Sequence, residues 1–438
     1  MAWGKLERNA DGSVARWHSL VDHMLDVAAC FLALSSCTAV RRALERTAGK
    51  ELNNPALARL AVLVFLHDIG KANTGFQGRR WLDHARPHGW ANPAGHGGEA
   101  LLALDSKDER LLAGLPLAQM DQWGSSVMGL LLASISHHGR PIADCVGMDP
   151  AIWRPAAGAD GALLYSPTLT LDEIGATLAR AFPVAFEAGG DELPGSPAFA
   201  HLFAGLVQLA DWLGSDTRFF PFTASGEDRV QTVFARADEA VAAIGMDVRS
   251  ARQALAGAPP DFARTFGIPT PHPMQLAAGE PTLGSLVILE AETGSGKTEA
   301  ALWRFARLFD AGVVDALYFA LPTRVAASQI YERVRQFATQ LWPGRPPVVV
   351  RALPGYEAAD GEKAVRLPDF KVQWNDRPED REAHRRWAGE ASKRFLAATI
   401  AVGTIDQVLL AALRVRHAHL RHATLARSLL VVDEVHAS

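Results

Sequence analysis

The first half of the chain carries histidines and aspartates beside segments with helical apolar spacing. His67 and Asp68 follow an apolar run that ends at Leu66, and Gly70 and Lys71 come directly after them. The same half also contains His23, His96, His137, His138 and Asp211. Imidazole nitrogens and carboxylate oxygens bind Mn, Fe, Co, Ni or Zn ions, and several helices can surround one or two ions without strain. The pattern indicates a metal centre, and Gly70 is a predicted helix stop.

An adjacent His-Asp pair has a specific use where two ions are bound. One carboxylate can bridge metals about 3.5–4 Å apart, and such ions activate water and stabilise charge on a phosphoryl group. A lone histidine is more often a hydrogen-bonded core residue or a solvated one than a ligand. We give that interpretation to His18, His84, His88 and His201. Because His18 lies near His23 on the same segment, the choice between these two stays open.

A second group of residues suits phosphate binding. The apolar run 286–289 leads into Ala291-Glu-Thr-Gly-Ser-Gly-Lys-Thr298, and a helical segment follows. Strand, glycine-rich turn and helix form the context of a phosphate-binding loop, where Gly294, Ser295 and Gly296 let backbone N–H groups face an anion. Lys297 supplies charge to the outer phosphates, and the Thr298 hydroxyl can hold Mg²⁺. ATP with Mg²⁺ is the expected ligand.

Two further segments fit a nucleotide site. Asp433 and Glu434 follow an apolar run in the sequence Asp-Glu-Val-His436. Asp433 is placed to hold Mg²⁺ through water, and Glu434 to orient or deprotonate the water that attacks the γ-phosphate. Gln275 could read adenine through its amide, and an ordinary loop glutamine is an equal alternative.

The two groups need different scaffolds. Helical spacing at 20–34, 55–66, 127–135 and 200–210 predicts that the first half is an all-α bundle. Apolar runs alternate with helical segments in the second half, which predicts an α/β domain with a parallel sheet covered on both faces. The predicted strands are 286–289, 316–321, 347–350, 398–403 and 428–432. The charged segment 361–394 is expected to be a solvated excursion.

Length and composition bound the organisation. The 438 residues have room for two or three domains, predicted at 1–220 and 263–438 with a helical connector at 221–262. A net charge of −4 excludes a uniformly basic nucleic-acid binder, so such contacts must come from local patches or a metal. The three cysteines contain no C-x-x-C pair and fit a reducing cytoplasm, and neither a signal peptide nor a membrane span is expected.

The segment Leu66-His-Asp-Ile-Gly-Lys71, with the other histidines and Asp211 in this order, resembles the HD-domain phosphohydrolase superfamily. The His137-His138 doublet and the motor motifs that follow resemble more narrowly the CRISPR-associated helicase-nucleases of type I interference systems. This resemblance implies an HD nuclease domain followed by a superfamily two DExH helicase domain with a RecA-like fold. It implies single-stranded DNA as substrate and the Cascade surveillance complex as the partner that selects DNA in antiviral defence.

The resemblance also implies roles for the residues of the first half. Asp68 would bridge two metal ions, and Lys71 would lie near the scissile phosphate. The implied metal ligands are His23, His67, Asp68, His96, His137, His138 and Asp211.

Helicases of this family continue into a second RecA-like domain that supplies arginine fingers. The sequence stops at Ser438, so we expect another polypeptide or a longer chain to supply that domain, and we expect poor ATP hydrolysis by this chain alone. Two other classes stay open. One is an HD phosphohydrolase that acts on small nucleotides and uses the P-loop domain as a regulator. The other is a non-catalytic fragment that docks a partner.

Overall fold

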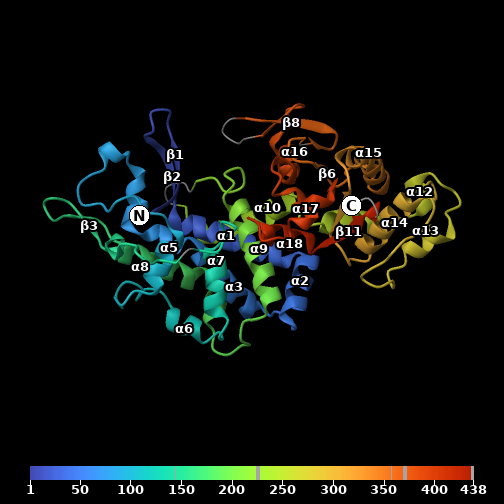
Figure 1. Ribbon diagram of the computed structural model, residues 1–438. Coiled ribbons are helices and arrows are strands. Elements are labelled where there is room, and N and C mark those ends of the chain that lie inside the picture. The colour runs from blue at the N-terminus through green and yellow to red at the C-terminus, as the bar shows by residue number, and fades with distance from the viewer. Residues whose placement is uncertain (143, 223–226, 357, 368–371, 436–438) are drawn as a thin grey trace. The chain divides into compact units, whose positions relative to one another are not determined.

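The computed structural model describes residues 1–142, 144–222, 227–356, 358–367 and 372–435, so His436 lies outside the described residues (Figure 1). The chain divides into two compact units. The first contains residues 1–35 and 44–240, and the second contains residues 36–43 and 241–438. The first unit is mainly helical and the second is built on a mostly parallel sheet, as the sequence predicts. The domain boundaries that the sequence analysis places after residues 220 and 262 stay a prediction.

Long apolar helices form the frame of the first unit. Asn53 begins one of them by accepting a hydrogen bond from Ala56 N at 2.9 Å, and the Phe31 and Phe203 rings join two others edge to face at 5.5 Å. The frame helices are α1 (Leu20–Ser36), α3 (Asn54–Phe65), α7 (Val127–Ile135) and α9 (Pro197–Gly214).

Further elements complete the first unit. Between α3 and α5 the chain forms the 3-10 helix η1, and the irregular region predicted at 149–195 contains the fifteen-residue helix α8. These elements are η1 (Leu66–Ala72), α4 (Thr74–Gln77), α5 (Gly97–Leu104), α6 (Leu117–Asp121), α8 (Pro167–Ala181) and α10 (Arg229–Ala243). Helix α2 (Thr38–Ala48) and helix α10 each contribute residues to both units. Among the described residues no single helix is long and apolar enough to cross a membrane, and only the bent pair α1 and α2 passes that test together.

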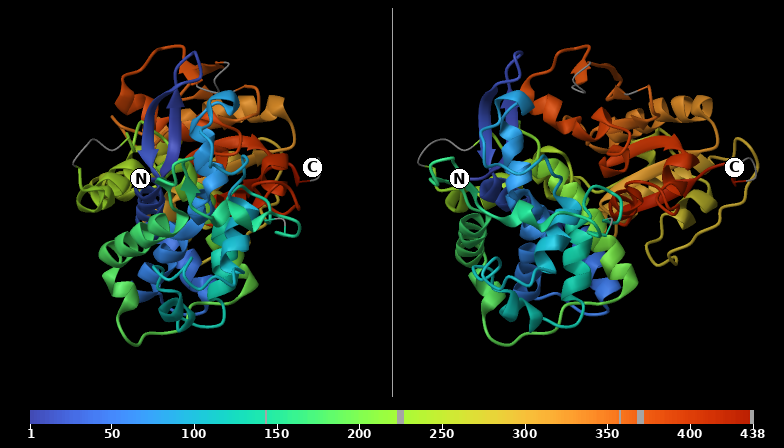
Figure 2. Two further views of the ribbon diagram at one scale, coloured as in Figure 1. Left: turned by 90° about the vertical axis from the view of Figure 1, so that its left-hand side faces the viewer. Right: turned by 60° about the vertical axis from the view of Figure 1, so that its left-hand side comes forward.

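Two short hairpins are an addition that the all-α prediction lacks. Strands β1 (Trp3–Arg8) and β2 (Val14–Ser19) pair antiparallel, and β3 (Ala156–Ala157) pairs with β4 (Leu163–Tyr165). The β1–β2 hairpin, in dark blue, projects from the helices of its unit (Figure 1; Figure 2). Its base is fixed by Trp3, whose buried ring stacks on Phe76 at 4.6 Å.

A seven-stranded sheet organises the second unit, in the order β11-β5-β10-β6-β7-β8-β9. The first four strands of this order are parallel and the last three are antiparallel. The strands are β5 (Ala316–Leu321), β6 (Val349–Ala352), β7 (Ala358–Ala359), β8 (Glu362–Arg366), β9 (Val372–Trp374), β10 (Ile400–Thr404) and β11 (Ser428–Val432). The helices are α11 (Arg249–Gly257), α12 (Phe262–Phe266), α13 (Pro273–Ala278), α14 (Lys297–Asp310), α15 (Arg324–Leu341), α16 (Asp380–Arg385), α17 (Ile405–Leu409) and α18 (Ala418–Leu425).

Two predictions for the second half are wrong. The run 286–289 is not a strand, and the side chains of Leu286 and Ile288 are 82% and 84% exposed. A strand is stabilised by a paired neighbour and a packed face, and this run has neither among the described residues. The region 361–394 is not a solvated excursion, because β8 and β9 extend the sheet there and Trp374 and Trp387 are buried.

Candidate metal centre and phosphate-binding loop

Several elements of the first unit bring the predicted metal ligands together. His23 comes from α1, His67 and Asp68 from η1, and Asp211 from the last turn of α9. Helix α9 approaches α1 closely at Gly214, where an added Cβ would lie 2.9 Å from Val27 N. His96 precedes α5, and His137 and His138 follow α7. Donor atoms of these residues form three overlapping groups, each within 4.8 Å: His96, His137 and His138; His23, His67 and Asp68; His67, His137 and Asp211.

The Asp68 carboxylate lies between two pairs of imidazoles. Its Oδ2 is 3.1 Å from His23 Nε2 and 3.4 Å from His67 Nε2. Its Oδ1 is 3.4 Å from His96 Nε2 and 3.6 Å from His137 Nε2. Because each oxygen faces a different pair of rings, the carboxylate has the arrangement of a bridging ligand.

Asp211 and His138 extend the two sides of this arrangement. Asp211 Oδ1 lies 3.9 Å from His23 Nε2 and 3.8 Å from His67 Nε2. On the other side, His138 Nε2 lies 2.7 Å from His96 Nε2. Two ring nitrogens at that distance can share a proton or face one cation.

Backbone carbonyls orient two of the rings. His67 Nδ1 donates to Val64 O at 2.9 Å, and His137 Nδ1 donates to Ser134 O at 3.2 Å. A proton on Nδ1 leaves the Nε2 lone pair free to bind a cation in the centre. His67 Nε2 and Asp68 Oδ1 are buried and have no hydrogen-bond partner among the described residues. The centre therefore fits cations that would satisfy these atoms.

Charge states also suit metal binding. Burial lowers the pKa of His96 to about 4 and of His137 to about 3, and it holds the pKa of His23 well below the ordinary value. Burial alone would raise the pKa of Asp68, but the Lys71 ammonium, 2.5 Å from Oδ2, and the His67 ring hold it well below its usual range. Near neutral pH these imidazoles are neutral and the carboxylate is ionised, which are the forms that bind metals.

His18 belongs to the core, as the sequence predicts for a lone histidine. It is buried, and its Nε2 lies 2.9 Å from Asp26 Oδ2. Arg229 donates to both oxygens of the same carboxylate, at 2.8 and 2.9 Å. His23, rather than His18, therefore faces the centre.

Gly70 is not the helix stop that the sequence suggests. Helix α3 ends at Phe65, and the chain continues through Gly70 in η1. A Cβ at Gly70 would lie 1.8 Å from the His96 carbonyl oxygen. Glycine is required there because two segments that carry candidate ligands meet at that point.

Sequence reasoning missed the contribution of the β1 strand. Lys71 Nζ donates to Gly4 O at 3.4 Å, and Lys5 Nζ donates to Gly214 O at 3.3 Å. No motif or ligand spacing marks Gly4 and Lys5, because a short strand far from the other residues in sequence brings them to the centre.

The predicted phosphate-binding loop has the expected turns. Gly294 and Gly296 adopt φ values of 81° and 86°, which L side chains rarely tolerate, and α14 begins at Lys297. Lys297 Nζ donates to Ala291 O at 2.7 Å and to Glu292 O at 2.9 Å. The ammonium is thus held over the loop, where an anion at the helix start would compete with these carbonyls.

Other predicted residues lie on the loop itself. The Ser295 hydroxyl donates to Glu292 O at 2.7 Å. The Thr298 hydroxyl accepts from Arg333 Nη1 at 3.4 Å, and Arg333 also pairs with Glu299 at 2.5 Å. An arginine of α15 is therefore available to charges at this loop.

Gln275 lies against the loop but its amide is already engaged. Its Oε1 accepts from His272 N at 2.8 Å, and its Nε2 donates to Gly296 O at 3.2 Å. Recognition of adenine by the Gln275 amide stays a prediction.

The acidic pair lies at the end of β11. Asp433 N donates to Ala320 O at 3.0 Å, so this residue continues the β11–β5 ladder. Asp433 and Glu434 therefore stand at the carboxyl end of the sheet, where the predicted topology places them.

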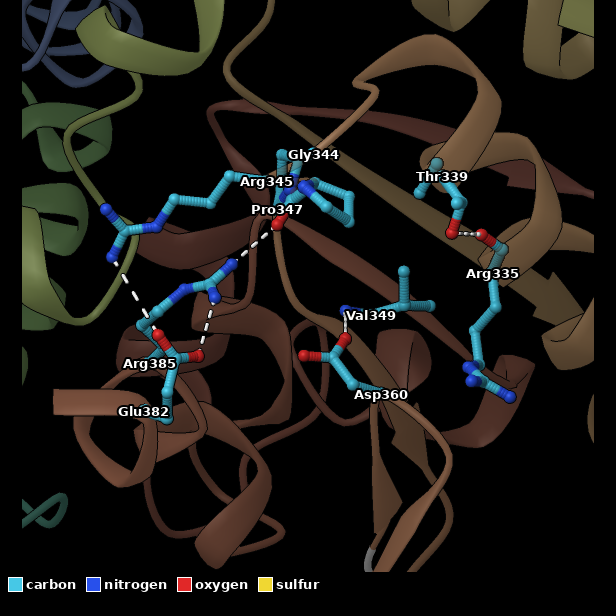
Figure 3. A pocket seen from close by; sticks show the side chains of 11 residues that line it. Arg335, Thr339, Gly344, Arg345, Pro347, Val349, Asp360, Glu382 and Arg385 are labelled. Atoms are coloured by element: carbon cyan, nitrogen blue, oxygen red, sulfur yellow. Dashed lines mark hydrogen bonds and ion pairs between the residues drawn. The ribbon is translucent and has the colours of Figure 1, made fainter. Parts of the chain in front are cut away.

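A cavity of about 520 Å³ lies at the amino end of β6 (Figure 3). Its charged side chains pair with one another: Glu382 accepts from Arg385 at 2.7 Å and lies 3.9 Å from Arg345. Asp360 accepts from Val349 N at 2.9 Å. The third arginine of the lining, Arg335, pairs with Glu332 at 2.7 Å. Because each arginine already has a carboxylate neighbour, the cavity is not a strong anion site.

The fold and the two sites define a hydrolase that joins an HD domain to a helicase domain. Residues 3–220 match the family of the Cas3 HD domain, and residues 272–438 match the DEAD/DEAH box helicases. An HD domain implies divalent metal binding. The chain belongs to the Cas3 family.

Relatives support this assignment. The CRISPR-associated endonuclease/helicase Cas3 of Thermus thermophilus is 30% identical over 459 residues, which cover 96% of this chain and 45% of that protein. A crystal structure titled T. fusca Cas3-AMPPNP is 26% identical with a TM-score of 0.66, covering 100% of this chain and 47% of that one. A chain in a structure titled CRISPR RNA-guided surveillance complex, pre-nicking, shares the fold at 24% identity and a TM-score of 0.55, covering 99% of this chain and 44% of that one. The chain spans about half the length of these proteins.

Proposed function

We propose that this chain hydrolyses phosphodiester bonds of single-stranded DNA in type I CRISPR interference. The observation that carries the proposal is the Asp68 carboxylate, whose two oxygens face separate pairs of imidazoles. This arrangement suits two divalent ions of Mn, Fe, Co or Ni, which when bound would supply activated water and stabilise phosphoryl charge.

Different residues at the centre would bind the two ions and the substrate. His23, His67 and Asp211 would hold an ion at one oxygen of Asp68. The rings of His96, His137 and His138 would hold the second ion. Lys71, which pairs with Asp68 at 2.5 Å and is partly exposed, is placed to bind a phosphate oxygen of the substrate.

The second unit is proposed to be the first RecA-like domain of an ATP-driven DNA motor. Lys297 and Thr298 would hold the phosphates and Mg²⁺ of ATP, Asp433 would hold Mg²⁺ through water, and Glu434 would act on the attacking water. The AMPPNP complex of the T. fusca relative supports a nucleotide at this domain. A second RecA-like domain would complete the motor.

The proposed partners follow from the same comparisons. A Cascade-type surveillance complex would select viral DNA by guide pairing, so the nuclease itself needs no sequence preference. The surveillance-complex structure with a similar chain supports this partner. A nuclease with this partner would act in the cytoplasm, which is the proposed location.

The test is cleavage of circular single-stranded DNA. Purified chain is incubated with Mn²⁺, Co²⁺, Ni²⁺, Fe²⁺ or Mg²⁺, with and without ATP. Wild type is compared with Asp68→Ala and with Asp121→Ala, which removes an exposed carboxylate of α6. We expect cleavage that needs a transition metal, survives without ATP, disappears in Asp68→Ala and persists in Asp121→Ala.

Two results would contradict the proposal. Cleavage by Asp68→Ala at the wild-type rate would remove the metal centre from the reaction. Phosphate release from free nucleotides with intact single-stranded DNA would favour a nucleotide phosphohydrolase instead.

A further inference from the structure

The β1 strand lies directly on the metal centre. A Cβ added at Gly4 would lie 3.1 Å from His23 Cβ, so the strand touches the helix that carries this candidate ligand. Gln77 fixes the strand on its other side by accepting from Trp3 N at 2.9 Å, and Gly4 O accepts from Lys71 Nζ at 3.4 Å. The residue that follows Gly4 is therefore held at the edge of the centre.

That residue is Lys5, and its environment is unusual for a lysine. The side chain is half-buried, and its Nζ donates to Gly214 O at 3.3 Å, in the helix turn that carries Asp211. Burial lowers the pKa of Lys5 to about 8, although Asp211, Asp26 and Asp68 act in the opposite direction. An ammonium has three N–H donors, and this is the one hydrogen bond that the described residues provide.

An anion is the ligand that this position requires. The carboxylates of the centre face imidazoles and would be committed to cations. Lys5 would then face excess positive charge, because ions in the centre repel an ammonium. A phosphate oxygen would accept the remaining N–H bonds and offset that repulsion.

We propose that Lys5 is a substrate-binding cation of the nuclease centre that contacts a non-bridging oxygen of the phosphodiester to be cut. Lys71 and Lys5 would then act together, one beside Asp68 and the other beside the end of α9. This inference rests on the proposed nuclease function and names a residue that binds its substrate.

The alternative is a purely structural role. A cation at the carboxyl end of a helix is favourable by itself, and Lys5 donates to a last-turn carbonyl of α9. The two roles separate in Lys5→Gln, which keeps an N–H donor but has no charge, and in Lys5→Met, which has neither. Lys5→Arg restores the charge. Lys50→Met removes a half-exposed lysine that pairs with Asp191 at 3.7 Å and donates to Glu192 O at 2.7 Å.

The experiment uses the 438-residue chain loaded with Mn²⁺. Manganese content, thermal unfolding, and kcat and KM on single-stranded DNA are measured for all variants. We expect Lys5→Gln and Lys5→Met to bind manganese as wild type does and to lose about 10–100-fold in kcat/KM, the effect of one charge-assisted bond. Lys5→Arg should recover most of this loss, and Lys50→Met should equal wild type.

A second readout does not depend on cleavage. Orthophosphate binding to the Mn²⁺-loaded chain should weaken about 10-fold or more in Lys5→Gln. Wild-type orthophosphate affinity in that variant would overturn the assignment of Lys5, as would wild-type kcat/KM or a parallel loss of manganese. A wild-type chain that binds orthophosphate but leaves DNA intact would overturn the nuclease function, and the phosphate measurement would still decide the role of Lys5.

Discussion

Asp68 combines burial with two separate sets of neighbours. Each carboxylate oxygen faces its own pair of rings at 3.1–3.6 Å, and Lys71 keeps the group ionised. The adjacent His67 and Asp68 in the sequence suggest a bridge, and the folded chain adds that each oxygen of Asp68 has its own imidazole neighbours. Substitution of this one residue should therefore affect both halves of the centre at once.

His23 and His18 provide a matched pair for a first prediction. His23→Ala should weaken manganese binding by more than about 10–100-fold, the usual effect of losing a group that only orients a ligand. His18→Ala should leave manganese affinity near wild type but lower the free energy of unfolding by about 1–3 kcal/mol, because a buried hydrogen bond to Asp26 is lost. Calorimetric titration measures the manganese affinity of each variant, and urea unfolding measures its free energy of unfolding. Equal manganese affinities for the two variants would show that His23 is not a ligand.

The depressed imidazole pKa values predict how stability depends on pH in the metal-free chain. His96 and His137 have pKa values of about 4 and about 3, against 6.5 for a free histidine. Between these values the unfolded chain binds protons that the folded chain does not, so stability is fully present above about pH 6.5 and falls as pH decreases. The loss should reach roughly 3 kcal/mol for His96 by pH 4. Urea unfolding from pH 7.5 to 4.5 with a chelator tests this, and a constant unfolding midpoint would contradict it.

Packing between η1 and α5 decides whether the ligands meet. The close approach at Gly70 leaves no room for a side chain, since a Cβ would overlap the His96 carbonyl. Gly129 of α7 offers a matched control, because a Cβ there meets no atom within 4 Å.

Gly70→Ala should therefore destabilise the chain by several kcal/mol and weaken metal binding, because η1 and α5 must separate. Gly129→Ala should stabilise the chain by up to about 1 kcal/mol, since alanine favours a helix. Thermal unfolding with and without Mn²⁺ measures the stability of each variant and the stabilisation that the metal provides. A Gly70→Ala chain as stable as wild type would contradict the described contact.

Predictions from the sequence were most reliable for strongly periodic, buried elements. Helix α7 and strand β5 have the bounds that apolar spacing predicts, because burial of one continuous apolar surface determines them. Strand β11 also has its predicted bounds, but its residues are only partly buried and its pairing with β5 defines it. The run 286–289 shows the limit of this reasoning: an apolar segment becomes a strand only if a neighbour pairs with it. The antiparallel strands β8 and β9 are not predicted, because three of the five residues of β8 are charged and β9 has only three residues.

The clustering of the candidate metal ligands could be predicted from residue types and order, whereas the residues that support them could not. Hydrogen bonds from His67 and His137 to carbonyls one turn earlier follow from local backbone geometry. Lys5 comes from a hairpin that joins the centre only after the chain has folded, and no spacing rule connects it with Asp211.

The chain as a whole carries two sites in two compact units. We expect each site to keep its activity when the other is inactivated. Lys297→Ala should abolish ATP binding and leave ATP-independent DNA cleavage unchanged, since the Lys297 ammonium donates to carbonyls of its own loop. Asp68→Ala should abolish cleavage and leave ATP binding unchanged. Fluorescent-nucleotide binding and gel assays of DNA cleavage check both. Loss of both activities in either variant would contradict independent sites.

The most direct test is a crystal structure of the chain soaked in Mn²⁺, with anomalous scattering recorded near the manganese edge. Two anomalous peaks are predicted, each bound to a different oxygen of Asp68, one among His23, His67 and Asp211 and the other among His96, His137 and His138. Peaks that do not touch Asp68, or one ion bound by a single pair of histidines, would contradict the bridged centre.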